Sequence, residues 1–173
     1  MTLIEIMIAL SILAISILAL LSSLCAAAKL QDVTRERALA QNAARAKIEE
    51  MRSRTYTQIY SLYNSNPADD PGGPGTAPGA TFTVPGLNAF PGVPVGQIVF
   101  PESGGGLLES LVDPSRGIDA SMGMPRDLNG NGIIDVVPFT TGYQILPVKI
   151  VITWKSANGK KSRFEINELI ASE

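Results

Sequence analysis

The chain of 173 residues contains no histidine and a single cysteine, Cys25. Without histidine it lacks the usual general base, the usual zinc ligand and the partner that activates a catalytic serine or cysteine. One cysteine cannot close a disulfide within the chain, and we interpret Cys25 as a small apolar packing residue rather than a reactive thiol. We therefore expect a protein that is not an enzyme.

Clustered positive charge is also scarce. The formal net charge is −2, and the sequence contains no long block of Lys and Arg. A nucleic-acid-binding protein usually carries such a block as its electrostatic footprint. We expect no nucleic-acid partner.

The beginning of the chain, by contrast, is rich in apolar residues. Between Ile6 and Ala28 there is no charged side chain. At 1.5 Å per residue this run forms a helix about 35 Å long, and the hydrocarbon layer of a membrane is about 30 Å thick. We predict a membrane-spanning anchor over residues 1–28.

Glu5 is the only charged side chain within the first 28 residues. A carboxylate at the edge of the hydrocarbon layer costs a few kcal/mol unless it has a partner. That partner is the α-amine of Met1, on the same chain or on a neighbouring copy. In the alternative interpretation, Glu5 only complements the positive end of the helix dipole in the first turn.

The first ten residues, MTLIEIMIAL, resemble the N-terminus of mature type IV pilins and of the pseudopilins of type II secretion systems. Met1 followed by Thr2, Leu3, Ile4 and Glu5 is similar to the minor pseudopilin I branch. The segment VITW near the other end of the chain also resembles minor pilins of the pilin V and pseudopilin I type.

The resemblance implies a structural subunit of a type IV pilus-like filament. It implies that a prepilin peptidase has cut the chain before Met1, that Met1 is N-methylated, and that Glu5 pairs with the Met1 amine of a neighbour. The partners would be copies of the chain in a helical homopolymer, or related pilins, and the pilus assembly machinery. The protein would lie in the inner membrane before assembly and in an extracellular pilus or periplasmic pseudopilus afterwards.

Two other functions remain open at this point. The first is a minor pseudopilin that forms the tip of a type II secretion pseudopilus or initiates it. This function is suggested by the absence of helix breakers: major type IV pilins often carry a helix-breaking Gly and Pro in the spine, where this chain has Ala14 and Ser22. The second is a membrane-tethered, calcium-dependent binding domain.

Residues 29–63 continue the helical period while their composition turns polar. Apolar residues recur at steps of three, four or seven, which predicts an amphipathic helix half that packs on a globular domain; they are Val33, Ala40, Ala44, Ile48 and Met51. No Gly or Pro occurs before Asn66, so we expect one helix throughout. The spacing of Tyr56, Tyr60 and Tyr63 favours core or subunit contacts.

Residues 64–126 hold 10 of the 12 prolines and 12 of the 16 glycines. This composition excludes a continuous helix or sheet. We expect a long wrapping loop with strand-like islands at 81–84 and 97–100, fixed by apolar anchors. The alternative is a disordered linker.

The segment DLNGNGIID matches the first nine positions of a calcium loop of the EF-hand kind. Its ligands would be Asp127, Asn129, Asn131, the Ile133 carbonyl and Asp135. The twelfth position, normally Glu, is Pro138, so Asp119 or Asp113 would have to complete a Ca²⁺ site. The alternative is a tandem Asn-Gly turn without metal.

The last forty residues predict a β-hairpin. In the first strand, Val148, Ile150 and Ile152 alternate on one face, and Asn158-Gly159 supplies a turn. The second strand runs back along the first and contributes apolar residues to the core, namely Phe164, Ile166 and Leu169. The expected fold class is α+β, in which a long N-terminal helical spine packs on a small antiparallel sheet. The expected segments are 1–28, 29–63, 64–126 and 127–173.

Overall fold

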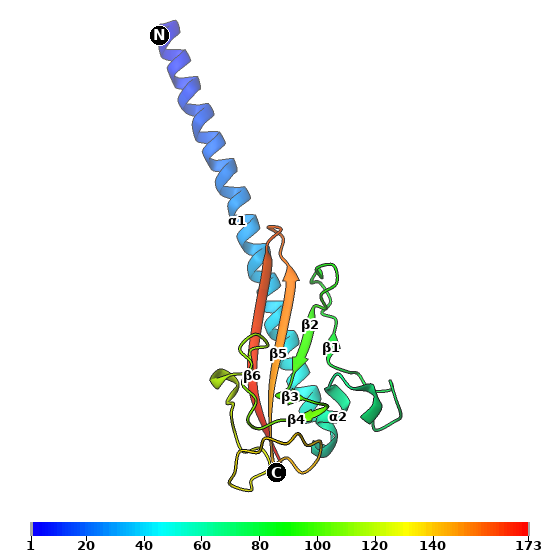
Figure 1. Cartoon of the computed structure of the whole chain (residues 1–173). Helices are drawn as coiled ribbons and strands as arrows, with labels where there is room; N and C mark the ends of the chain where they lie inside the picture. Colours follow the sequence, from blue (N-terminus) through cyan, green and yellow to red (C-terminus); the bar gives the residue numbers. More distant parts are fainter. Residues whose placement is uncertain (1, 173) are drawn as a thin grey trace.

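A computed structural model of the chain describes residues 2–172. Helix α1 (Leu3–Arg52) runs through the whole molecule: its first half projects alone, and its second half lies against the globular domain (Figure 1). The domain is a four-stranded antiparallel sheet in the order β1-β2-β5-β6. The fold is therefore α+β, as predicted.

The sheet is built around one long hairpin. Strand β5 (Ile145–Lys155) pairs with β6 (Lys161–Ala171), while β2 (Gly96–Val99) and β1 (Thr81–Phe82) extend the sheet on the other side of β5. The hairpin turns at Gly159, whose φ of 78° favours glycine. The predicted hairpin and both strand-like islands are confirmed.

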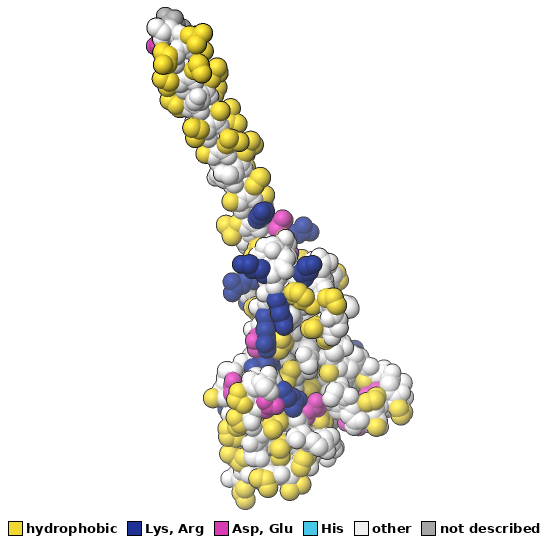
Figure 2. Space-filling view, turned by 45° about the horizontal axis from the view of Figure 1, so that its top comes forward, with side chains coloured by type: hydrophobic (Ala, Val, Ile, Leu, Met, Phe, Trp, Pro, Cys, Tyr) yellow, Lys and Arg dark blue, Asp and Glu magenta, His cyan; other side chains and the backbone are white. Residues whose placement is uncertain are grey.

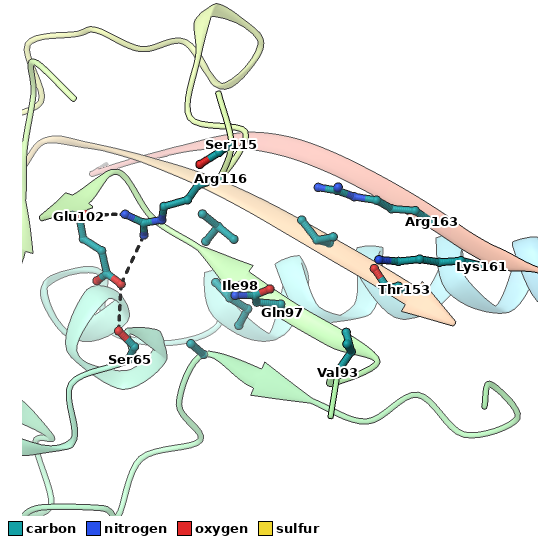
Figure 3. Close-up of a pocket in the computed structure, with 13 residues that line it drawn as sticks. Ser65, Val93, Gln97, Ile98, Glu102, Ser115, Arg116, Thr153, Lys161 and Arg163 are labelled. Atoms are coloured by element: carbon teal, nitrogen blue, oxygen red, sulfur yellow. Dashed lines mark hydrogen bonds and ion pairs between the residues drawn. The ribbon is translucent and has the colours of Figure 1, made fainter. Parts of the chain in front are cut away.

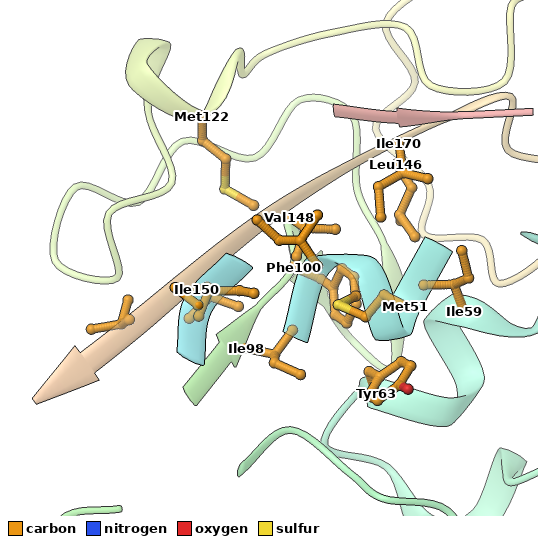
Figure 4. Packing of buried hydrophobic residues seen from close by; sticks show 14 of the residues in the cluster. Met51, Ile59, Tyr63, Ile98, Phe100, Met122, Leu146, Val148, Ile150 and Ile170 are labelled. Atoms are coloured by element: carbon orange, nitrogen blue, oxygen red, sulfur yellow. The ribbon is translucent and has the colours of Figure 1, made fainter. Parts of the chain in front are cut away.

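The core lies between the second half of α1 and one face of the sheet (Figure 4). The predicted helix stripe supplies Ala40, Ala44, Ile48 and Met51, all buried. Opposite the helix, Ile150 pairs in register with Ile98 on β2 and Ile166 on β6. The two alanines have short side chains, so they let the helix approach the sheet closely.

The helix ends earlier than the sequence predicted. It stops at Arg52 instead of continuing to about Tyr63, and a 3₁₀ turn, η1 (Tyr56–Gln58), and a short helix, α2 (Ile59–Tyr63), follow. The Ser53 hydroxyl donates to the Glu50 carbonyl at 2.7 Å and so competes with the helical hydrogen bonds. The turn brings Ile59 and Tyr60 into the core, where a straight helix would carry them past the sheet.

The tyrosines are core residues, as expected. Tyr60 and Tyr63 are buried, and Tyr60 packs edge-on against Phe100 with ring centroids 5.4 Å apart. Burial raises the pKa of both hydroxyls, and each donates to a carboxylate: Tyr60 to Glu102 at 3.1 Å and Tyr63 to Glu50 at 2.9 Å.

Residues 64–126 follow an ordered course over the domain. Predicted anchors Val95, Ile98 and Phe100 are buried, while Phe82 and Phe90 are half-buried. The segment contains four short elements besides β1 and β2. They are η2 (Pro67–Asp69), η3 (Ala120–Met122), and the paired strands β3 (Glu102–Ser103) and β4 (Gly106–Leu107). The segment thus runs over the domain as a long loop with short elements.

On the outer face of the sheet, one apolar side chain is exposed and one charged side chain is buried. Leu169, expected to return into the core, is 41% exposed because it shares the outer face of β6 with Arg163 and Glu165. Lys149 is buried on the outer face of β5, where its ammonium group donates to the Gly117 carbonyl. The wrapping loop covers this part of the sheet.

Glu36 fastens the hairpin tip to the helix. Its carboxylate accepts hydrogen bonds from Trp154 Nε1 at 3.1 Å, from the Ser156 hydroxyl and from the Ala157 amide at 2.8 Å. Partial burial raises the pKa of Glu36, but these three hydrogen bonds outweigh it and leave the pKa below its ordinary value of 4.5.

We predict that Glu36→Ala lowers the free energy of unfolding by roughly 1–2 kcal/mol, because three donors lose a charged acceptor at a partly exposed site. Urea denaturation of the full chain in detergent measures this. Asp32→Ala, one helical turn earlier and exposed, is the control and should have little effect.

The effect should also depend on pH. Since the folded-state pKa of Glu36 is lowered, its contribution is complete above the unfolded-state pKa and is lost as the pH falls through the folded-state value. The difference between the wild type and Glu36→Ala should therefore shrink in acid. An undiminished difference at low pH would contradict the assigned role of the carboxylate.

Candidate functional site

The apolar side chains in the first half of α1 are exposed. Figure 2 shows them along the face of the helix that is in view. Fourteen large apolar side chains between Leu3 and Leu24 have exposed fractions of 48–78%. Burying them would contribute on the order of 20 kcal/mol. The helix is long and apolar enough to cross a membrane, a test that a signal sequence also passes. A surface of this kind can be buried in lipid or among other apolar helices.

Glu5 lies in the first turn of this helix. The Thr2 amide donates to its carboxylate at 3.4 Å, so within the chain Glu5 caps the positive end of the helix. The Met1 amine, its predicted partner, lies outside the described residues.

Small polar side chains in the apolar half turn back onto the helix. The hydroxyls of Ser11 and Ser16 each donate to a carbonyl four residues earlier at 2.8 Å, and Ser22 donates to Ala19. Their polar groups are thereby satisfied without water, as a membrane or a helix bundle demands. Cys25 lies exposed on the same half.

The predicted calcium loop is folded around the carboxylate of Asp127. One of its oxygens accepts from the Gly130 amide and the other from the Gly132 amide, both at 2.7 Å. These hydrogen bonds hold the pKa of Asp127 below its usual range, with the Gly132 amide contributing most. The φ values of 77° and 86° at Gly130 and Gly132 explain why glycine stands at these turns.

The remaining predicted ligands gather at Asp135. The side-chain amide nitrogens of Asn129 and Asn131 donate to its carboxylate at 3.1 and 2.9 Å. The carbonyl oxygen of Asn131 accepts from the Ile133 amide at 2.8 Å. The structure therefore brings the predicted residues of the loop together.

A residue that the sequence interpretation missed connects the loop to the core. Glu109 is fully buried, and its carboxylate accepts from the amides of Leu128 at 2.8 Å, Asn129 at 3.1 Å and Asp135 at 2.7 Å. Apolar residues flank it in the sequence, namely Leu107, Leu108, Leu111 and Val112, but nothing in the sequence indicates that this carboxylate contacts the loop.

Asp113 and Asp119, the remote carboxylates suggested from the sequence, bond within their own turns. Each accepts from the amide and the hydroxyl of the serine two residues later, Ser115 and Ser121 respectively. Glu109 is therefore the remote carboxylate that contacts the loop.

The loop carries uncompensated negative charge. Among residues 2–172, no ion pair involves Glu109, Asp127 or Asp135. In the same range no three acidic, cysteine or histidine side chains converge as a metal cluster. The donor set nevertheless suits Ca²⁺, which prefers carboxylate, amide and backbone oxygens and draws them from alternate positions of one loop.

A polar groove of about 380 Å³ lies on the outer face of the sheet (Figure 3). Lys161 and Arg163 line one side of it, and Arg163 pairs with Glu165 at 2.8 Å. On the other side Glu102 accepts from the Ser65 hydroxyl at 3.1 Å and lies 4.0 Å from Arg116. Of the charged side chains that line the groove, only Glu102 and Arg116 lie within ion-pair distance of each other among residues 2–172.

Comparison with known proteins adds no family: no protein-family model matches the chain, and no curated protein or solved structure matches it significantly.

We predict that Glu109→Gln destabilises the domain by roughly 1–3 kcal/mol, since the new amide nitrogen faces a backbone donor in a buried site. Thermal unfolding measures the loss, and limited proteolysis should find new cleavage within 127–138. Glu49→Gln, on an exposed part of α1, is the matched control. Equal stability of the two variants would contradict the role assigned to Glu109.

Proposed function

We propose that this chain is a structural subunit of a type IV pilus-like filament. The observation that carries the proposal is the bare apolar half of α1, with one carboxylate in its first turn and a compact domain at its other end. The N-terminal sequence MTLIEIMIAL, which resembles mature pilins and pseudopilins, supports it.

In this proposal the apolar half first spans the inner membrane and then packs among the same halves of neighbouring subunits. Lipid and a helix bundle are similarly apolar, so hydrophobicity alone does not select the bundle. Glu5 of one subunit pairs with the N-terminal amine of the next and thereby fixes their register. Repeating one such contact along an axis gives an open filament, extracellular or periplasmic.

A minor pseudopilin of a type II secretion system is the second candidate. The feature that favours it is the uninterrupted α1 of 50 residues, since no Gly or Pro breaks the spine as in many major pilins. The share of the protein in purified filaments separates the two functions: a major subunit is abundant, and a tip or initiating subunit is present in traces.

We predict that Glu5→Ala inserts into the membrane normally but enters filaments at a level reduced at least about tenfold, because a charge pair in an apolar bundle is strongly favourable. Shearing the filaments and quantifying the subunit measures this. The matched control, Glu49→Ala, removes an exposed carboxylate of the same helix away from its apolar half and should assemble normally. Normal assembly of Glu5→Ala would exclude the pairing.

We also propose that the loop 127–135 binds Ca²⁺. Asp127, Asp135, the side-chain carbonyls of Asn129 and Asn131 and the backbone carbonyl of Ile133 would hold the ion. The uncompensated charge of Glu109, Asp127 and Asp135 favours a cation here. The ion would fix a loop that no disulfide constrains.

Millimolar Ca²⁺ should raise the melting temperature of the full chain above its value in excess chelator, because binding to the folded state stabilises it by mass action. The calcium-dependent shift should vanish in Asp127→Asn. It should persist in Asp119→Asn, whose carboxylate caps a separate turn. If the wild type shows no shift, the tandem-turn interpretation without metal is correct.

A further inference from the structure

Exposed Lys and Arg side chains gather where the apolar half of α1 meets the domain, as Figure 2 shows on the face in view. We call them the basic collar, which comprises Lys29, Arg35, Arg37, Lys155, Lys160 and Lys161. All six are exposed, and none forms an ion pair with another described residue. The collar thus differs from Arg52, Arg116 and Arg163, which are paired with carboxylates.

The collar has two parts, one on α1 and one on the hairpin, which are distant in the sequence. They lie at about the same height along the axis of α1. Lys29 follows directly on Ala28, the last residue of the uncharged run. Glu36 lies two turns further on the same face as Lys29 and binds the hairpin tip through Ala157. The Glu36 contact therefore holds Lys160 and Lys161 near the helix, about 12 Å beyond Ala28 along its axis.

This level corresponds to the surface of a membrane that α1 would span. The headgroup region extends about 5–7 Å beyond the hydrocarbon on each side. The remaining distance is within the Debye length of about 8 Å at physiological ionic strength. Cations of the collar would consequently act on lipid phosphates with little screening.

The collar has an excess of positive charge although the chain is acidic overall. Its segments, 29–37 and 155–161, contain six cations and two carboxylates, Asp32 and Glu36, which leaves a charge of +4. Glu36 is engaged by hydrogen-bond donors of the hairpin rather than by cations. The complementary ligand is a surface dense in anions.

We propose that the basic collar binds the headgroups of anionic phospholipids and orients the domain on the membrane before assembly. The inference rests on the membrane anchor of the proposed function. A rod of about 35 Å fits a hydrocarbon layer of about 30 Å by tilting, and flanking anchors set the direction of tilt. Because three of the six cations lie on the hairpin, the collar directs the tilt toward the hairpin side.

The experiment uses the full chain in sealed vesicles. The variant Cys25→Ala, Ala157→Cys carries a fluorophore at the exposed hairpin tip, and nitroxide on the lipid headgroups quenches it by proximity. Quenching should rise about twofold from pure phosphatidylcholine to vesicles with an equal part of phosphatidylglycerol, and fall back in about 1 M salt, where the Debye length is about 3 Å.

Two double variants with the same loss of charge test the residues. Lys160→Gln with Lys161→Gln should lose most of the response to phosphatidylglycerol. Arg45→Gln with Arg54→Gln, exposed positions further along α1 and beyond it, should retain the response. Equal quenching in both lipids, or an undiminished response in the collar variant, would overturn the proposal.

Further outcomes separate this proposal from the filament. If quenching follows protein density instead of phosphatidylglycerol, the collar contacts another copy of the chain and the lipid proposal is wrong. If alkaline carbonate extracts the chain from vesicles, the membrane anchor and the collar fail together. If the collar responds to lipid while Glu5→Ala assembles normally, only the Glu5 pairing fails.

Discussion

One continuous helix has to satisfy two different environments, and the rest of the structure depends on this constraint. Up to Leu30 the side chains of α1 are exposed, whereas Ala40, Ala44, Ile48 and Met51 are buried under the sheet. All packing between helix and domain is therefore confined to the last two dozen residues of α1. A long hairpin laid along the helix supplies enough contact there, because β5 and β6 each have eleven residues.

Carboxylates organise the parts of the domain that regular structure does not. Glu36 fixes the hairpin tip, Glu109 fixes the loop at residues 127–135, and Glu102 accepts from Tyr60 and Ser65 at the start of the wrapping segment. Each joins segments far apart in the sequence through charge-assisted hydrogen bonds, which are stronger than neutral ones. In a chain with one cysteine, they perform the cross-linking that disulfides provide in other small domains.

The sequence predicted the features that local periodicity encodes, and missed those that tertiary contacts decide. The helix stripe and the hairpin follow from the spacing of apolar residues such as Ala44 and Ile150. The end of α1 at Arg52 does not follow from this spacing, because no Gly or Pro marks it. The turn after Arg52 is favoured by the packing of Ile59 and Tyr60 in the core. Glu109 was missed for a similar reason: only the folded chain brings three distant amides to it.

In the proposed function, electrostatics governs when a subunit leaves the membrane. Transfer of the apolar half of α1 from lipid to a helix bundle changes its hydrophobic free energy little. Two charge interactions then oppose each other: binding of the basic collar to lipid retains the subunit, and pairing of Glu5 favours the filament. Salt screens the exposed collar more than a charge pair within an apolar bundle. Rising ionic strength should thus shift the balance toward assembly.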